Sequence, residues 1–365
     1  MVVKMDSLLR HCERIKLKKD LKSMTMEELS AYISALGEPK FRAKQIFQWL
    51  HRGVRTFSEM TDLPKSLQTK LEDESFITTL SIFKKFKSRL DDTVKYLFFL
   101  EDGNIIETVA MKYQHGYSVC ISSQVGCRMG CSFCQSTKKG LVRSLTAGEI
   151  LDQIIRVQED LKLRISNIVM MGIGEPLDNF DEVLRFLKNV NDPNGVNIGY
   201  RHISLSTCGL VPQIQKLAEY QLPITLSISL HATSDERRTS VMPINRKYNI
   251  NQLIEACREY QKITGRRISF EYAVIQGVND RPIDAENLAK LLRGLLCHIN
   301  LIPVNPIENG EYYPPSKNNL YAFQARLIKL GMNATVRRTL GGDISASCGQ
   351  LRHQAQKGGN ANCES

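Results

Sequence analysis

The central part of the chain alternates between short apolar runs and longer amphipathic stretches. Six runs rich in β-branched and aromatic residues predict strands at residues 117–124, 165–172, 201–209, 224–232, 267–277 and 298–306. Six stretches with a helical repeat of apolar positions alternate with them, at residues 147–162, 180–190, 210–220, 250–265, 285–295 and 320–331. This alternation indicates an α/β domain with a parallel sheet. Six units are too few for a closed eight-unit barrel, so we expect a partial (β/α)6 barrel with its chemistry at the carboxyl ends of the strands.

The segments on either side of this array have other patterns. Three short helices are expected before it, at residues 24–37, 40–53 and 63–74. A hairpin is expected at residues 94–113, with Asp102-Gly103 as its turn, and a strand followed by a glycine-rich loop at residues 334–351. The chain is therefore expected to divide into a basic helical accessory domain (1–95), a catalytic barrel domain (96–353) and a disordered tail (354–365).

Charge adds a prediction about the partner. The chain carries a net charge of +11, and residues 1–95 hold 19 Lys and Arg against 13 Asp and Glu, a net +6. This excess favours a polyanion such as RNA, although solvated helix faces would give the same count. No run approaches the roughly 18 apolar residues of a membrane span, and the first residues lack the apolar core of a signal peptide. We expect a cytoplasmic protein with no membrane partner.

The cysteines contain the strongest chemical signal. There are ten, at positions 12, 120, 127, 131, 134, 208, 257, 297, 348 and 363. Cys127, Cys131 and Cys134 follow the first strand of the array, at a spacing that can hold three irons of a [4Fe-4S] cube and leave the fourth without a protein ligand. A zinc site is the alternative, but zinc needs a fourth ligand, and neither His115 nor Cys120 has a typical spacing.

Further polar residues fall at the expected strand ends. The loop Gly172-Ile-Gly174-Glu175-Pro176 is glycine-rich, so it is either a close approach to a ligand or a tight turn. The other candidates are Ser206, Ser229-Leu230-His231 and Asn305. Three more residues stand apart from these: Cys348 between small residues, Cys120 on the first strand, and Glu107 on the hairpin. Taken singly, each of these is as well explained by a buried structural role.

Taken together, these motifs resemble the radical SAM superfamily, and within it the dual-specificity adenine-C2 RNA methyltransferase family. The resemblance runs from about residue 35 to 353, through FRAKQIFQW, the cysteine loop, MGIGEPLDN, SISLHA, MPIN, GVND, LIPVNP and DISASCGQL. Ser347 departs from the alanine that is usual in the family. The resemblance implies a TIM-like partial barrel of the radical SAM type, a [4Fe-4S] cluster on Cys127, Cys131 and Cys134, and two molecules of S-adenosylmethionine (SAM) per turnover.

The resemblance also assigns roles to individual residues. It implies that SAM is bound by Gly174, Glu175, Ser206, Ser229, Leu230, His231 and Asn305. Cys348 would carry the methyl group as S-methylcysteine, Glu107 would accept the ring proton, and Cys120 would release the product through a transient disulfide with Cys348. The implied substrates are adenine 2503 of 23S rRNA and adenine 37 of tRNAs. An electron donor such as flavodoxin or ferredoxin is implied as a partner, and we expect a monomer.

Two other functions compete with this one. The first is methylation of C8 rather than C2 of adenine, as in the related antibiotic-resistance enzymes. Pro176 in MGIGEPLDN favours C2, because the C8 branch tends to alter this segment. The second is a non-catalytic iron–sulfur protein that only binds RNA. Such a protein would need neither Cys348 nor Cys120, and SAM cleavage by the reduced protein would separate it from an enzyme.

Overall fold

The computed structural model describes residues 18–114, 116–307, 310–351 and 354–355, and the chain divides into two compact units. The first contains residues up to Ser81 together with Thr146–Leu163 and Asp181–Ile198. The second contains Ile82–Leu145, Arg164–Phe180 and the chain from Gly199 onward. The first unit is therefore assembled from three separate segments of the chain.

The first unit is mostly helical. Its helices are α2 (Met26–Ala35), α3 (Phe41–Arg52), α4 (Lys65–Glu74), α5 (Ala147–Leu161) and α6 (Phe180–Asn191), with short 3-10 turns at Leu21–Ser23 and Phe57–Glu59. Two-residue strands β1 (Lys19–Asp20) and β2 (Ser75–Phe76) pair in parallel. The apolar faces of the N-terminal helices form one core, in which Leu29, Ile46 and Leu71 are fully buried.

Local signals explain where these helices begin and end. Thr25 and Glu28 form a capping box at the start of α2, since each side chain accepts a hydrogen bond from the other's main-chain N–H. Gly53 ends α3 in the left-handed region, at φ 97°. A Cβ atom at this position would lie 2.9 Å from Nη2 of Arg156 on α5, so the residue must be glycine for two reasons.

A buried ionic cluster stabilises the first unit. The carboxylate of Asp152 on α5 accepts hydrogen bonds from Nζ of Lys22 and from the main-chain N–H of Leu80, both at 2.7 Å. It also lies 3.3 Å from Nε of Arg156, and the side chains of all three charged residues are at most 1% exposed. Burial lowers the pKa of Lys22, and the charge of Asp152 opposes that shift.

Replacing Asp152 with Ala should therefore destabilise the protein. Lys22 would lose its buried anion and Arg156 would keep only Glu159, and leaving a buried charge unpaired costs about 3–5 kcal/mol in comparable sites. A lower midpoint of thermal unfolding would report this loss. Glu255→Ala is the control, because it removes an exposed pair with Arg258 and should cost less than about 1 kcal/mol. Equal effects of the two substitutions would contradict the prediction.

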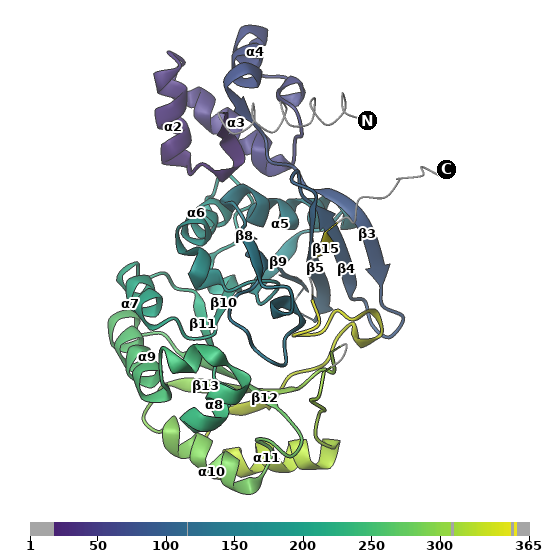
Figure 1. Ribbon diagram of the computed structural model, residues 1–365. Helices are drawn as coiled ribbons and strands as arrows, with labels where there is room; N and C mark the ends of the chain where they lie inside the picture. Colours follow the sequence, from purple (N-terminus) through teal and green to yellow (C-terminus); the bar gives the residue numbers. More distant parts are fainter. Residues whose placement is uncertain (1–17, 115, 308–309, 352–353, 356–365) are drawn as a thin grey trace. The chain divides into compact units, whose positions relative to one another are not determined.

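The second unit is built on one large mixed sheet (Figure 1). Its parallel strands are β6 (Gly116–Cys120), β9 (Ile165–Met170), β10 (Ile203–Thr207), β11 (Thr225–Ser229), β12 (Ile268–Val274), β13 (Cys297–Pro303) and β14 (Ala334–Val336). The antiparallel strands β3 (Ser81–Lys87), β4 (Val94–Phe99) and β5 (Asn104–Tyr113) extend it beyond β6, and β15 (Gln354–Ala355) pairs with β5. The strand order runs from β14 to β3 without closing, which is the expected partial barrel.

Four longer helices of this unit alternate with its strands: α7 (Val211–Glu219), α9 (Ile250–Thr264), α10 (Pro282–Leu291) and α11 (Lys317–Lys329). Figure 1 shows them along one side of the sheet, where α7 packs on α9 and α10 on α11. A shorter helix, α8 (Asp235–Val241), follows β11. These helices cover one face of the sheet. The loops at the carboxyl ends of its strands form the site described below.

Several details besides helix α8 differ from the sequence-based expectation. The first strand ends at Cys120, and Gln124–Gly126 form a separate strand, β7, that pairs with β8 (Leu141–Ser144). Strand β3 lies within the expected helical domain 1–95 but belongs to the large sheet. The expected tail begins with β15, and its remaining residues lie outside the described part of the chain.

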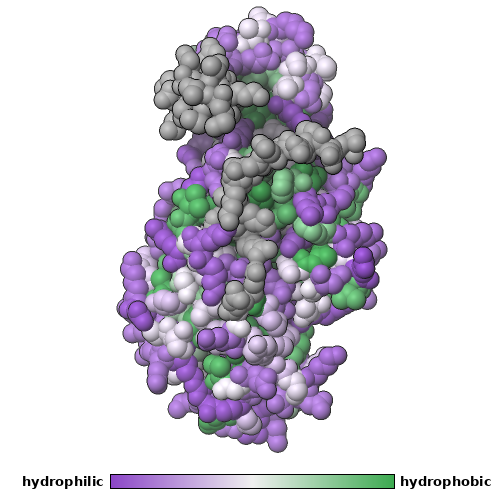
Figure 2. Space-filling model, turned by 45° about the vertical axis from the view of Figure 1, so that its right-hand side comes forward, coloured by the Kyte–Doolittle hydropathy of each residue, from purple (hydrophilic) through white to green (hydrophobic). Residues whose placement is uncertain are grey.

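The surface turned to the viewer in Figure 2 is mostly hydrophilic, with separate hydrophobic patches. Exposed apolar side chains on strand β3 include Ile82 and Phe83, which are 41% and 51% exposed. Among the described residues, we find no helix whose length and apolar character would allow it to cross a membrane.

Candidate active site

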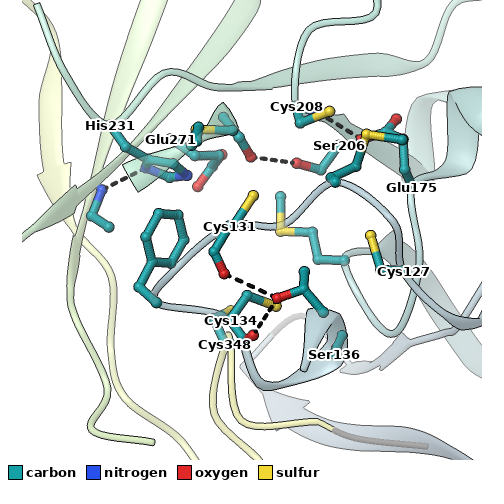
Figure 3. Close-up of a pocket in the computed structure, with 18 of the residues that line it drawn as sticks. Cys127, Cys131, Cys134, Ser136, Glu175, Ser206, Cys208, His231, Glu271 and Cys348 are labelled. Carbon is teal, nitrogen blue, oxygen red and sulfur yellow. Dashed lines mark hydrogen bonds between the residues drawn. The ribbon is translucent and has the colours of Figure 1, made fainter. Parts of the chain in front are cut away.

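A cavity of about 160 Å³ opens at the carboxyl ends of the parallel strands of the second unit. It contains the three cysteines of the expected cluster site, Cys127, Cys131 and Cys134, and also Cys348 (Figure 3). Six of the seven residues expected to bind SAM line it as well: Gly174, Glu175, Ser206, Ser229, His231 and Asn305. We call this space the cluster cavity. Residues from five separate strand ends and from the end of the chain thus meet in one place.

The cysteine loop, residues 127–134, is held by its own main chain. The N–H of Cys127 donates to the carbonyl of Gly140 at 3.0 Å, and the N–H of Cys134 donates to that of Cys131 at 3.1 Å. Oγ1 of Thr137 donates to the carbonyls of Cys131 and Cys134. Gly130 supplies a positive φ of 73° between the first two cysteines. The loop therefore presents its thiols from a fixed backbone.

The donor set of this loop fits an iron–sulfur cluster. In the described part of the chain no three His, Cys, Asp or Glu side chains converge closely enough to hold a single metal ion as they stand. The three thiols instead border one cavity whose other walls include the apolar side chains of Phe133 and Ile302. Burial raises the pKa of all three thiols, and that of Cys127 reaches about 12.

The loop after β9 packs closely against the chain at Ser123 and Gln124, where Gly174 leaves the space. Gly174 has a φ of 105°, and a Cβ atom there would lie 2.6 Å from Cβ of Gln124. The adjacent Glu175 is buried, and its two carboxylate oxygens accept hydrogen bonds from the main-chain N–H groups of Leu177 (3.0 Å) and Cys208 (2.7 Å). Burial raises the pKa of Glu175, whereas these hydrogen bonds lower it. The carboxylate is thus fixed in the cavity wall, where it can accept a further hydrogen bond from a bound amine.

His231 is held as a neutral donor. Its Nδ1 accepts a hydrogen bond from the main-chain N–H of Ala273 at 2.9 Å, which leaves Nε2 to carry the proton. The residue has a positive φ of 58°, and its ring meets the edge of Phe133 with a centroid distance of 4.9 Å. Burial and the nearby Arg238 lower the pKa of His231 to about 3. The imidazole is therefore uncharged across the physiological range.

The ends of strands β10 and β11 place serine side chains, but not Leu230, in the wall of the cluster cavity. The hydroxyl oxygens of Ser206 on β10 and Ser229 on β11 are 3.5 Å apart, and both residues line the cluster cavity. Leu230 is fully buried and is not part of the wall, so the structure does not bring its side chain to the other expected SAM contacts. Its carbonyl accepts a hydrogen bond from Nε of the buried Arg238, whose Nη2 also binds the carbonyls of Cys208 and Ser229.

A second, smaller cavity contains the two cysteines outside the cluster site that were expected to form a transient disulfide. Cys120, the last residue of β6, and Cys348 both line this space of about 30 Å³, which we call the thiol cavity. Both thiols are free, and burial raises the pKa of Cys120 to about 12. Arg337, directly after β14, lines the same space as the two thiols. Because Cys348 borders both cavities, it lies between the cluster cavity and Cys120.

The loop that carries Cys348, residues 341–351, is anchored through its carbonyl groups. Nζ of Lys95 donates to the carbonyl of Ser345 at 3.2 Å, and Nδ2 of Asn305 donates to that of Cys348 at 3.0 Å. The N–H of Gln135 donates to the carbonyl of Gly349 at 2.8 Å, and Oγ of Ser136 to that of Leu351 at 2.7 Å. We call this segment the Cys348 loop. Its anchors include the two residues that directly follow the cysteine loop.

Glu107 lines a third cavity, of about 380 Å³, together with Lys95, Gln135 and Ser345. The residue is on β5, opposite Leu97 of β4, and its side chain is only 2% exposed. The structure therefore places Glu107 beside the Cys348 loop, in a cavity distinct from the one that contains the three cluster cysteines. We call this space the Glu107 cavity.

The sequence did not single out Arg238, Arg337 or Lys95. All three are recognised only through their positions in the folded chain, although Arg337 directly follows a predicted strand. Cys208, which falls at the end of a predicted strand, also lines the cluster cavity. Cys257 is buried on α9 and Cys297 is half-buried on β13, whereas Cys12 and Cys363 lie outside the described residues.

Comparison with known proteins identifies the family of the chain. Two family models match the chain: the radical SAM superfamily over residues 121–289, and the ribosomal RNA large subunit methyltransferase N-terminal domain over residues 19–77. A crystal structure of a radical SAM methyltransferase from Sphaerobacter thermophilus superimposes with a TM-score of 0.87 and 44% identity, over 91% of this chain and 99% of that one.

Sequence relatives are closer still. A probable dual-specificity RNA methyltransferase RlmN from Alkaliphilus oremlandii is 57% identical over 337 residues, which cover 92% of this chain and 98% of the relative. A protein of the same description from Clostridioides difficile is 52% identical, over 92% of this chain and 97% of the relative. The chain therefore belongs to the RlmN-type dual-specificity RNA methyltransferases of the radical SAM superfamily.

Proposed function

We propose that the protein methylates C2 of adenine 2503 in 23S rRNA and of adenine 37 in tRNAs, through a methyl group carried on Cys348. One observation carries the proposal: Cys348 borders both the cluster cavity and the thiol cavity that contains Cys120. A residue in this position can receive a group on one side and be attacked by a second thiol on the other. An iron–sulfur protein that only binds RNA would need no such arrangement.

The enzyme uses a [4Fe-4S] cluster and SAM, two molecules per turnover. The thiolates of Cys127, Cys131 and Cys134 would hold the cluster, which supplies the 5′-deoxyadenosyl radical by reductive cleavage of SAM. Glu175 would accept a hydrogen bond from the amine of SAM, and the neutral His231 would donate one from Nε2. Gly174 leaves the space that a side chain would fill.

The transfer itself would use three residues of this chain. Cys348 would take a methyl group from one SAM, and after hydrogen removal its S-bound carbon would add to C2 of adenine. Glu107 would accept the ring proton, since its carboxylate lies in the cavity next to the Cys348 loop. Cys120 would then attack the sulfur of Cys348, so that the S–S bond forms as the S–C bond to the product breaks and the freed carbon takes up the proton of the Cys120 thiol. The one electron left over from the radical addition would pass to a one-electron acceptor, for which the oxidised cluster is the candidate. Reduction of this disulfide would complete the cycle.

Mass spectrometry of RNA nucleosides tests the proposal. The reconstituted, reduced enzyme is incubated with SAM and with 23S rRNA or tRNA, and we expect 2-methyladenosine from both. A product methylated at C8 would replace the proposed position with the other one. Cleavage of SAM without any methylated nucleoside would contradict the proposed methyl transfer.

The first unit would contribute to RNA affinity through its positive charge. Lys44 and Arg52 are both exposed on α3, and the Arg52 guanidinium lies 5.2 Å from the ring centroid of Trp49. Reversing both charges, in Lys44→Glu with Arg52→Glu, should weaken RNA binding about tenfold and reduce the slope of log affinity against log salt by about 2. Binding titrations at several salt concentrations would measure both effects.

Lys329→Glu is the control for this prediction, because Lys329 is exposed on α11 in the second unit. An equal loss in the control would show that the effect is one of net charge rather than of position. Unchanged binding by the double reversal would show that this charge is only a solvated surface. The remaining parts of the proposal are an electron donor such as flavodoxin or ferredoxin, a monomeric state and a cytoplasmic location.

A further inference from the structure

Lys95 is a buried lysine on a strand next to the edge strand of the large sheet, and burial is unusual for an ammonium group. It lies on β4, and its side chain is 9% exposed. Its Nζ is 3.7 Å from Oε2 of Glu107 and donates a hydrogen bond to the carbonyl of Ser345 at 3.2 Å. One cation therefore contacts both the carboxylate proposed as proton acceptor and the main chain three residues before Cys348.

The surroundings of this pair contain few other charges. The described titratable side chains that line the Glu107 cavity are Lys95, Glu107 and Asp343. Asp343 accepts hydrogen bonds from Oγ of Ser88 (2.7 Å) and the N–H of Arg89 (2.8 Å), and these contacts lower its pKa. Among the described side chains that line this cavity, Lys95 therefore supplies the ammonium group.

The elements packed around this pair add mainly neutral groups. From the segment between β6 and β7, Oγ of Ser122 donates to the carbonyl of Glu107, and from β3, the Phe86 ring lies 5.3 Å from Nζ of Lys95. Lys84, also on β3, lies 4.9 Å from that ring. Cys120, at the end of β6, is paired with Val109 of β5. It is the titratable residue of β6 whose pairing position lies nearest to Glu107 along β5.

A carboxylate 2% exposed is costly to ionise unless a positive charge lies close to it. A base must be ionised to accept a proton, so its partner cation affects the rate directly. We infer that Lys95 is a positioning residue, which keeps Glu107 in its ionised form and at the same time holds the Cys348 loop beside it. The inference deepens the proposed function, because it rests on Glu107 as the proton acceptor.

The expected consequence has a definite sign. Without the ammonium, the neutral acid form of Glu107 is favoured, and a higher pH is needed to ionise it. The acid limb of the pH–rate profile should therefore move to higher pH in Lys95→Met. Below both limbs, each pH unit of movement lowers the rate about tenfold. Lys95→Arg keeps a cation, so its acid limb should stay where it is in the unsubstituted enzyme, even if the rate is lower.

The experiment uses the full-length holoenzyme with reduced cluster and saturating SAM, and measures single-turnover formation of methylated adenosine in RNA as a function of pH. Iron content and SAM cleavage are measured for each variant, so that damage to the cluster site is seen separately. Lys112→Met is the matched control, because it removes an exposed lysine on the same sheet from its 3.1 Å ion pair with Asp92. Its profile should not change.

A second readout separates a chemical from a structural role. In RNA with deuterium at C2 of the target adenine, slower proton removal makes that step more rate-limiting, so the isotope effect should be larger in Lys95→Met than in the unsubstituted enzyme. A purely structural loss would lower the rate without this change. An unshifted acid limb in Lys95→Met, or a shifted one in Lys95→Arg, would overturn the inference.

Glu107→Gln distinguishes failure of this inference from failure of the proposed function. If Glu107→Gln methylates RNA at the normal rate, Glu107 is not the proton acceptor and the proposed function loses that step. If Glu107→Gln is inactive while Lys95→Met keeps the normal profile and isotope effect, the acceptor remains and only the role of Lys95 is wrong.

Discussion

Replacing Cys348 and Cys120 with Ala should give two different failures. Cys348→Ala removes the sulfur that would take the first methyl group, so methylation of both protein and RNA should fall to background. Cys120→Ala leaves that sulfur in the cluster cavity, so the methyl-derived carbon can still add to adenine, but no thiol then attacks Cys348. This variant should accumulate protein linked covalently to RNA, with less than about one product released per enzyme.

Denaturing gels before and after nuclease treatment would show the linked species as a shifted band that nuclease shortens. Denaturing conditions are needed because tight non-covalent binding gives the same shift on a native gel. Cys297→Ala is the control, since Cys297 is half-buried at the start of β13 and lines neither the cluster cavity nor the thiol cavity. Normal turnover by Cys120→Ala, or methylated RNA from Cys348→Ala, would refute the covalent mechanism.

Cys131→Ala should abolish both the cluster and all SAM chemistry. Cys131 is buried and lies between two other thiols on one loop, so its loss leaves two ligands for a cube that needs three. Anaerobically purified protein should be brown with about four irons per chain, and the variant should be colourless and cleave no SAM. Iron analysis and absorption spectra measure the difference.

Cys257→Ala should keep the colour and the iron, because Cys257 is buried on α9 away from the cavity wall. This control separates loss of a ligand from general damage to the core. A colourless unsubstituted protein that contains one zinc would show that the loop holds a different metal.

The parallel part of the sheet was predictable because its strands are short apolar runs, most of them largely buried. All six predicted runs correspond to the parallel strands β6 and β9 to β13, and the hairpin of β4 and β5 was also expected. Strand β3 was missed, because six of its seven residues are exposed and Lys84 and Lys85 interrupt any alternation. Its extended form depends on the neighbouring strand, which a local pattern does not contain.

The first strand was predicted to end at residue 124, but it ends at Cys120. The apolar run continues past Cys120, but the N–H groups of Ser123 and Gln124 both donate to the carbonyl of Ile173 rather than to a partner strand. Helix α8 was missed because only two of its seven residues, Arg238 and Val241, are buried. By contrast, the capping box of Thr146 and Glu149 at the start of α5 depends on three residues of sequence and could be read directly.

The candidate site was predictable where its chemistry is local. The spacing of Cys127, Cys131 and Cys134 and the glycine at 174 indicate a ligand loop before any folding is considered. Arg238 and Lys95 are different, because each acts through contacts made by distant parts of the chain: three strand-end carbonyls in one case, Glu107 and Ser345 in the other. Nothing near them in the sequence indicates those partners.

The anchoring of the Cys348 loop has a consequence for the order of events during turnover. Lys95, Asn305, Gln135 and Ser136 all donate to main-chain oxygens of the loop, and none of these four bonds involves the sulfur of Cys348. The same bonds can therefore persist whether the sulfur is a thiol, a thioether or part of a disulfide. The main chain of the loop would then keep one position while only the bonding of the Cys348 sulfur changes. Successive steps would therefore not have to wait for a slow rearrangement of the loop.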